Sequence, residues 1–234
     1  MSVNQNLQQN GRRNFLGSLA TGVAAISMTG IATPMSLQAA ADNIVPFTSD
    51  DPDLWFNNIK GKHRVVFDVT QPHEIYPFAW PRVFLLTNSM TGTPENDCGV
   101  VVVLRHSAIG YAMDNQVWSK YKFGELFDAK DPATHQPATQ NPFWQPGPGA
   151  FKVPGVGEVS IGINELQDAG VMFCVCDMAM TVFSAAAASK MNMNADDVKK
   201  EWKAALLPGI QPVPSGVWAL GRAHEKGCAY IFAG

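Results

Sequence analysis

Two cysteines that lie one residue apart, Cys174 and Cys176, are the side chains of this sequence best suited to chemistry. They belong to the apolar run 171–176, whose β-branched and aromatic residues predict a strand buried on both faces. Asp177 follows where a helix N-cap belongs. Cys176 is therefore expected at the carboxyl end of a strand, beside a helix N-terminus and open to solvent. Backbone N–H groups and the helix dipole favour a thiolate there, so this thiol could accept and pass on sulfur as a nucleophile.

The same edge of the sheet is expected to carry further polar side chains. His106 ends a valine-rich run, and in a parallel sheet it would lie at the edge of Cys176, where it could stabilise the thiolate or relay a proton. His73 and Asp68 flank this edge near the end of the first strand, and we expect them and Cys174 to line the site. Each residue also has a purely structural interpretation: the cysteines as small buried apolar groups, and His106 as a ring bonded to a loop carbonyl.

The cysteines predict neither a disulfide framework nor a metal centre. Cys174 and Cys176 would share one face of a strand with Cα atoms about 6.5–7 Å apart, the upper limit for a disulfide. A C-x-C pair is also a poor tetrahedral clip for a metal, and the sequence has no second clip. Cys98 and Cys228 begin their strands at the opposite edge and are expected to be packing residues. The Gly-Val-Gly segment 155–157 follows no strand, so no cofactor site is predicted.

Strands and helices alternate along the sequence and would position these residues. The predicted strands, which are short and apolar, are 63–70, 98–106, 171–176, 210–214 and 228–232. The predicted helices lie between these strands. The first starts within 78–82 and ends near 91, and another starts at 177. The others cover 111–127, 159–169, 198–207 and 215–227. This alternation predicts one three-layer α/β/α domain with a parallel sheet. The Pro- and Gly-rich stretch 129–157 is predicted to be a loop throughout.

Residues 1–41 carry the features of a twin-arginine export signal. The arginine pair at 12–13, one spacer and Phe-Leu precede a weakly apolar segment, and the three alanines at 39–41 provide a cleavage site. We therefore expect export to a bacterial periplasm, with residues 42–62 as an irregular lead-in and residues 63–234 as a single domain.

The composition argues against two classes of partner. The chain has 17 basic and 20 acidic residues, a formal net charge of −3, and the only charged residues of the leader are arginines. The remainder is thus more acidic and has no basic runs, which argues against nucleic acid and against anionic lipid surfaces. No later segment is apolar over a long enough stretch to span a bilayer, so we expect no stable membrane insertion.

Three stretches resemble the DsrE/DsrF-like family, and the match runs over roughly residues 63–234. AGVMFCVCDMAM is similar to the family's GV-x-x-x-x-C strand, LLPGIQPVPSGVWALGRAHEKGCAYIFAG to its LPG-x-x-x-VPSG segment and terminal strand, and VVVVLRHSAIGYAM to its second strand. The resemblance implies a five-stranded parallel sheet of order 4-3-2-1-5 and homo-oligomers, often trimers or hexamers. In the sulfur-relay members it also implies a cysteine that carries sulfane sulfur as a persulfide, and Cys176 falls on that cysteine. The departures are Cys174, His224 where glutamine is usual, and the leader.

Three functions are compatible with these features. The first is a periplasmic carrier of persulfide sulfur, or a thiol-redox protein, that acts through Cys176 with sulfur donor and acceptor proteins rather than as a turnover enzyme. The second is a non-catalytic oligomer, structural or small-ligand-binding, in which Cys176 is a packing residue. The third, which the spacing favours least, is a metal-binding module built from Cys174, Cys176, His106 and His73.

Overall fold

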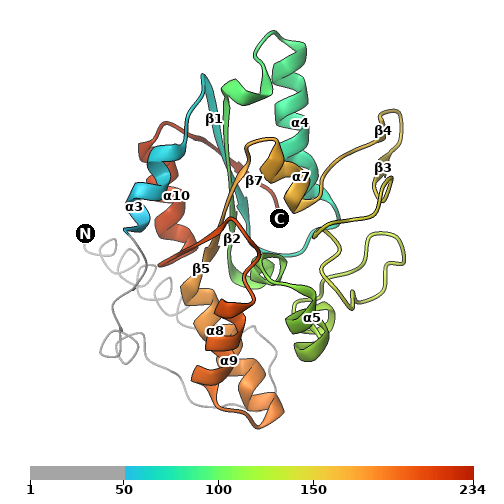
Figure 1. Cartoon of the computed structure of the whole chain (residues 1–234), viewed down its shortest axis with the longest axis vertical. Helices are drawn as coiled ribbons and strands as arrows, with labels where there is room; N and C mark the ends of the chain where they lie inside the picture. The colour runs from blue at the N-terminus through green and yellow to red at the C-terminus, as the bar shows by residue number, and fades with distance from the viewer. Residues whose placement is uncertain (1–50) are drawn as a thin grey trace, which may run out of the picture. The chain divides into compact units, whose positions relative to one another are not determined.

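A five-stranded parallel sheet lies at the centre of residues 51–234, the part of the chain that the computed structural model describes. Its strand order is β6-β5-β2-β1-β7, which is the order 4-3-2-1-5 implied by the family resemblance (Figure 1). All neighbouring strands of this sheet pair in parallel. The prediction of a three-layer α/β/α fold is confirmed. The predicted export signal lies outside the described residues.

The elements have the following bounds. The strands of the sheet are β1 (His63–Val69), β2 (Cys98–Leu104), β5 (Met172–Cys176), β6 (Ile210–Val213) and β7 (Ala229–Phe232). The helices are α3 (Pro52–Trp55), α4 (Tyr76–Met90), α5 (Asn115–Tyr121), α6 (Phe123–Leu126), α7 (Ile163–Asp168), α8 (Asp177–Met191), α9 (Ala195–Ala204) and α10 (Gly216–Glu225). Shorter 3-10 turns are η2 (Phe56–Asn58), η3 (Glu95–Asp97) and η4 (His106–Ala112), and a small hairpin pairs β3 (Lys152–Val153) with β4 (Gly157–Glu158).

The strand order explains why the helices divide between the two faces of the sheet. The chain moves in one direction from β1 to β2, β5 and β6, so right-handed crossovers place α4, α7 and α8 on one face. It then returns across the whole sheet to β7, which places α10 on the opposite face, beside α3 (Figure 1). The core is divided accordingly: a large cluster packs under α4, α7, α8 and α9, and a smaller one under α3 and α10.

Three predicted helices differ from the structure. The helix expected over 159–169 is shorter and covers only Ile163–Asp168. The helix expected to start within 78–82 starts at Tyr76, because Pro77 already fills the first turn, and Pro81 consequently lies inside the helix. The helix predicted over 111–127 is broken twice. The backbone is extended at Met113 and Asp114, between η4 and α5, and it is left-handed at Lys122, with φ 51°, between α5 and α6.

The stretch 129–157 is mostly irregular, as predicted, but it includes β3 and the first residue of β4. Phe143 and Phe151 stack within the large core cluster and fix the segment to the body of the protein. Among the described residues, no helix combines the length and apolar character needed to cross a membrane.

Candidate functional site

Cys176 ends β5 and is itself the N-cap of α8. Its Sγ accepts a hydrogen bond from the backbone N–H of Ala179 at 3.3 Å. Asp177, which the sequence suggested as the cap, is instead the first residue of the helix. The thiol therefore lies in direct contact with the free N–H groups of a helix start, where the helix dipole favours negative charge.

Burial of Cys176 is the main departure from expectation at this site. The residue is only 6% exposed, whereas the sequence suggested a thiol open to solvent. Its apolar contacts are with the large core cluster, while Cys174 packs with the smaller one on the side of α10. The expected shared face for the two cysteines is thus lost at the end of the strand, where the chain turns into α8.

The carboxylate of Asp177 fixes the start of α8 to the next helix. Its oxygens pair with Lys199 at 2.8 Å and Lys203 at 3.1 Å, both on α9. The two helices therefore form a rigid support behind the residue that caps α8.

A partly buried ion pair lies at the same edge of the sheet. Arg105, the first residue after β2, donates from Nε and Nη2 to the two carboxylate oxygens of Asp68 at 2.6 and 2.9 Å. The side chain of Asp68 is 2% exposed, and its Oδ2 also accepts from the Tyr230 hydroxyl at 2.8 Å. Such a two-pronged pair, supported by a third hydrogen bond, holds the guanidinium in one orientation.

Arg105 also lies within electrostatic range of Cys176. Its pKa is raised first by the hydrogen bond to Asp68, and the negative charges of Asp68, Tyr230 and Cys176 each add to the rise. The side chains of Arg105 and Cys176 are therefore close enough for their charges to interact. Arg105 is not among the site residues predicted from the sequence. The signal that could have found it is one Asp inside an apolar strand and one Arg directly after the next strand.

The start of α10 is shaped to admit Arg105. A Cβ on Gly216 would lie 2.5 Å from Cβ and 2.7 Å from Cδ of Arg105, closer than real contacts allow. Ser215 caps the helix by accepting from the N–H of Trp218 at 3.2 Å. The Pro-Ser-Gly sequence, whose Gly216 is the first residue of α10, therefore leaves room for the arginine stem at the helix N-terminus.

His106 lies near this edge but is turned toward α8. The structure ends β2 at Leu104, and His106 begins η4 with a left-handed φ of 50°. Its ring contacts Phe183 edge-on at 5.5 Å, and its Nδ1 lies 3.4 Å from the Ser107 hydroxyl. The His106 ring thus packs on α8, whereas Arg105 is a cation that interacts electrostatically with Cys176.

The other three cysteines lie in surroundings that favour the neutral thiol. Burial raises the pKa of Cys174, which packs beneath α10, and the negative charge of Cys176 adds to the rise. Burial also raises the pKa of Cys98 and of Cys228. All four cysteines are free and buried.

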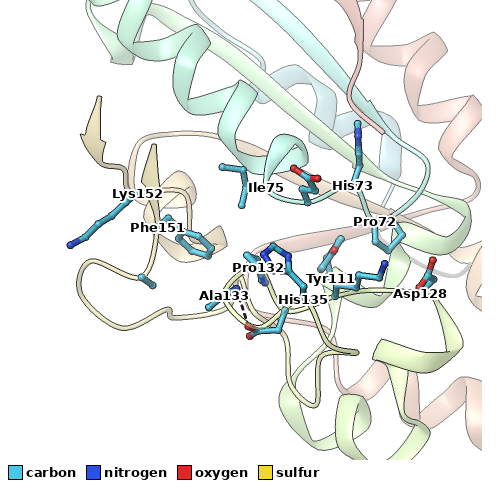
Figure 2. Close-up of a pocket in the computed structure, with 14 residues that line it drawn as sticks. Pro72, His73, Ile75, Tyr111, Asp128, Pro132, Ala133, His135, Phe151 and Lys152 are labelled. Atoms are coloured by element: carbon cyan, nitrogen blue, oxygen red, sulfur yellow. Dashed lines mark hydrogen bonds between the residues drawn. The ribbon is translucent and has the colours of Figure 1, made fainter. Parts of the chain in front are cut away.

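His73 belongs to a different feature, a cavity of about 510 Å³ shown in Figure 2. The cavity lies between the segment that follows β1 and the loop before β3, and Cys176 is not among its lining residues. Among residues 51–234, no group of three or more His, Cys, Asp or Glu side chains is arranged to hold a metal ion.

The comparisons with known proteins add little to this geometry. No protein-family model matches the sequence, and no curated protein matches it. Among solved structures, the chain is similar to a protein of unknown function, MTH1491 from Methanobacterium thermoautotrophicum, with 18% identity and a TM-score of 0.37 over 73% of this chain and 99% of that one. A likeness this distant identifies neither a family nor a function.

Proposed function

We propose that this protein is an exported sulfur carrier of the DsrE/DsrF-like type, in which Cys176 holds sulfane sulfur as a persulfide. The observation that carries the proposal is the position of the Cys176 sulfur, which accepts an N–H at the start of α8 within range of Arg105. The sequence motifs around 63–234 and the twin-arginine pattern within 1–41 support the family and the periplasmic location. By the same resemblance, the carrier would be a homo-oligomer that exchanges sulfur with donor and acceptor proteins.

The sulfur transfer needs no external oxidant. The Cys176 thiolate attacks the outer sulfur of a donor persulfide R–S–S–H, a new S–S bond forms, and the donor's S–S bond breaks. The products are Cys176–S–S–H and the thiolate R–S⁻, so atoms, charge and electrons balance. The helix N-terminus and Arg105 stabilise the negative charge on the attacking sulfur, and the reverse attack by an acceptor thiolate unloads the carrier.

Access to the thiol limits the kind of donor group. Cys176 is 6% exposed, whereas the side chain of Arg105 is 27% exposed, so the guanidinium is the part of the site that a small anion can reach from solvent. A single terminal sulfur, or a short polysulfide anion, fits such a site better than a bulky disulfide.

Intact mass measurement after treatment with inorganic polysulfide tests the proposal. We expect the wild-type protein to gain the mass of one sulfur atom and to lose it on reduction, and Cys176→Ser to gain none. Serine is itself a good N-cap, so this variant keeps the start of α8 and is expected to fold.

Cys228→Ser is the matched control, because Cys228 is also buried but lies in the small cluster under α10. It should be loaded like the wild type. Loading of Cys176→Ser to the same extent, or no loading of the wild type, would show that Cys176 is a packing residue and would sink the carrier function.

A further inference from the structure

The cavity of Figure 2 is a second candidate site, at the carboxyl edge of the sheet. One wall is the segment 72–75 after β1, and another is formed by residues 128–133 and 150–152 of the long loop. Tyr111, on the turn after β2, completes the lining between them. Ligands of open α/β sheets bind in the crevice outside the carboxyl ends of the strands, and a volume of about 510 Å³ suits a small organic molecule.

Tyr111 presents an unsatisfied polar group to this cavity. The residue is 2% exposed, and its ring packs against Phe78, Trp118 and Phe143. Its hydroxyl has no hydrogen-bond partner within residues 51–234, yet it is not among the fully enclosed unpaired atoms. The small exposed part of Tyr111 therefore includes the hydroxyl, which faces the cavity. Burial raises the pKa of this tyrosine, so the hydroxyl stays neutral.

Two carboxylates without a partner among the described residues line the cavity. Glu74 and Asp128 line it, and neither makes an ion pair or side-chain hydrogen bond within the described chain. One carboxylate oxygen of Asp131 accepts hydrogen bonds from the N–H groups of Ala133 and Thr134, at 3.0 and 2.9 Å. These bonds fix the carboxylate within the loop.

The lysines of the lining offset this charge only in part. Lys152 pairs with Glu158 at 3.4 Å, and Figure 2 shows its side chain directed away from the other labelled residues. Lys130 is then the one lining lysine without an ion pair among residues 51–234. The remainder of the lining includes apolar surface from Ile75, Pro132 and Phe151.

We propose that this cavity binds a small primary amine with an apolar body. The carboxylates of Glu74 and Asp128 receive the ammonium group, the hydroxyl of Tyr111 accepts or donates one further hydrogen bond, and the apolar surface of Phe151 covers the body of the ligand. This site is separate from the Cys176 thiol, so either assignment can fail without the other.

Three ligands that share one body and differ in their head group test the proposal on the full chain. We expect 2-phenylethylamine to bind saturably in isothermal titration calorimetry. 2-Phenylethanol should bind about tenfold more weakly, which is the loss of affinity expected when one charge-assisted hydrogen bond is removed. Phenylacetate should bind more weakly still. Butylamine and cyclohexylamine extend the test to amines with other apolar groups. Equal binding of the three phenyl compounds, tighter binding of phenylacetate, or no binding of any amine overturns the proposal.

Four variants test the residues. Tyr111→Phe and Glu74→Gln should each weaken 2-phenylethylamine binding several-fold, and Lys130→Gln should tighten it, because a repelling charge is removed. Lys122→Gln is the matched control and should bind like the wild type, since Lys122 does not line the cavity and pairs with Glu125 at 3.9 Å. Unchanged binding in both Tyr111→Phe and Glu74→Gln, with unfolding transitions like that of the wild type, would contradict the assignment.

Discussion

At the scale of single residues, Arg105 is the cation that the fold holds near the thiol of Cys176. Arg105 is held by both oxygens of Asp68, and Asp68 is held in turn by Tyr230, so the guanidinium has little freedom to leave. The missing side chain of Gly216 is part of this arrangement, because any Cβ there would meet the stem of Arg105 at 2.5 Å. The electrostatic link to Cys176 therefore depends on a glycine that carries no charge itself.

Gly216→Ala tests this dependence without removing a charge. We expect the methyl group to displace Arg105 and to slow the alkylation of Cys176 by iodoacetamide several-fold at neutral pH, measured by mass spectrometry. Gly221→Ala, on the same helix with nothing within 4 Å of the added Cβ, is the matched control. It should leave the rate unchanged and stabilise the fold by about 0.5–1 kcal/mol. Equal rates for the two variants would mean that Arg105 does not act on the thiol.

At the scale of elements, α9 is the support that joins the start of α8 to α5. Its Lys199 and Lys203 hold Asp177, and its Glu201 receives hydrogen bonds from Lys120 at 2.7 and 2.8 Å and from the Tyr121 hydroxyl at 2.5 Å. These interactions lie on the surface of the helices, so each contributes modestly, but together they define how α8 begins.

The Glu201 contact predicts a dependence of stability on acid pH. The hydrogen bond from Lys120 first, and that from Tyr121 second, lower the pKa of Glu201 below its ordinary value of 4.5. A lowered folded-state pKa stabilises the protein above the unfolded value, and this stabilisation is lost as the pH falls through the folded value. Urea denaturation should show Glu201→Gln less stable than the wild type at pH 7 by about 0.5–1 kcal/mol, because the carboxylate is partly exposed and screened.

The difference between the two proteins should shrink as the pH falls below 4.5, where the wild type loses the charge that the variant lacks. Lys122→Gln is a useful control, because Lys122 pairs only loosely with Glu125 at 3.9 Å. A constant difference between pH 7 and pH 3 would show that Glu201 acts through packing rather than through its charge.

At the scale of the whole molecule, the strand order brings two sites to one edge of the sheet. The thiol site is completed by the start of α10, where the chain leaves β6 and begins its return across the sheet. The amine cavity is completed by the loop before β3, whose Phe151 packs in the large core cluster with Tyr111. The two candidate sites can thus lie apart on one small domain, because α10 covers one face of the sheet and the loop before β3 packs on the other.

Much of this fold could be predicted because its determinants are local. The valine-rich run before Arg105 and the apolar run before Asp177 predicted buried parallel strands. The helices predicted over 198–207 and 215–227 are α9 and α10, although α9 starts three residues earlier, at Ala195. The break at Lys122 could not be predicted, since a left-handed residue in an amphipathic stretch has no sequence signal without glycine or asparagine.

The candidate site could be predicted only in part, because its contacts join distant segments. The place of Cys176 at a strand end follows from its neighbours in the sequence, but its burial depends on the side chains that pack over it. The Arg105–Asp68 ion pair joins the ends of two neighbouring strands, and Gly216, from a third segment, leaves room for the arginine. The pair therefore follows from the sheet register rather than from any sequence motif. His106 was placed at the right edge, but its left-handed backbone turns the ring toward Phe183.

The central claim is that Cys176 is the reactive thiol of a protein whose four cysteines are all buried. Limited alkylation of the native full chain with iodoacetamide, followed by peptide mapping over time, tests it most directly. We predict that Cys176 is modified first, well before Cys98, Cys174 and Cys228, whose pKa values are raised by burial. Modification of all four thiols at one common rate, set by unfolding of the domain, would contradict it.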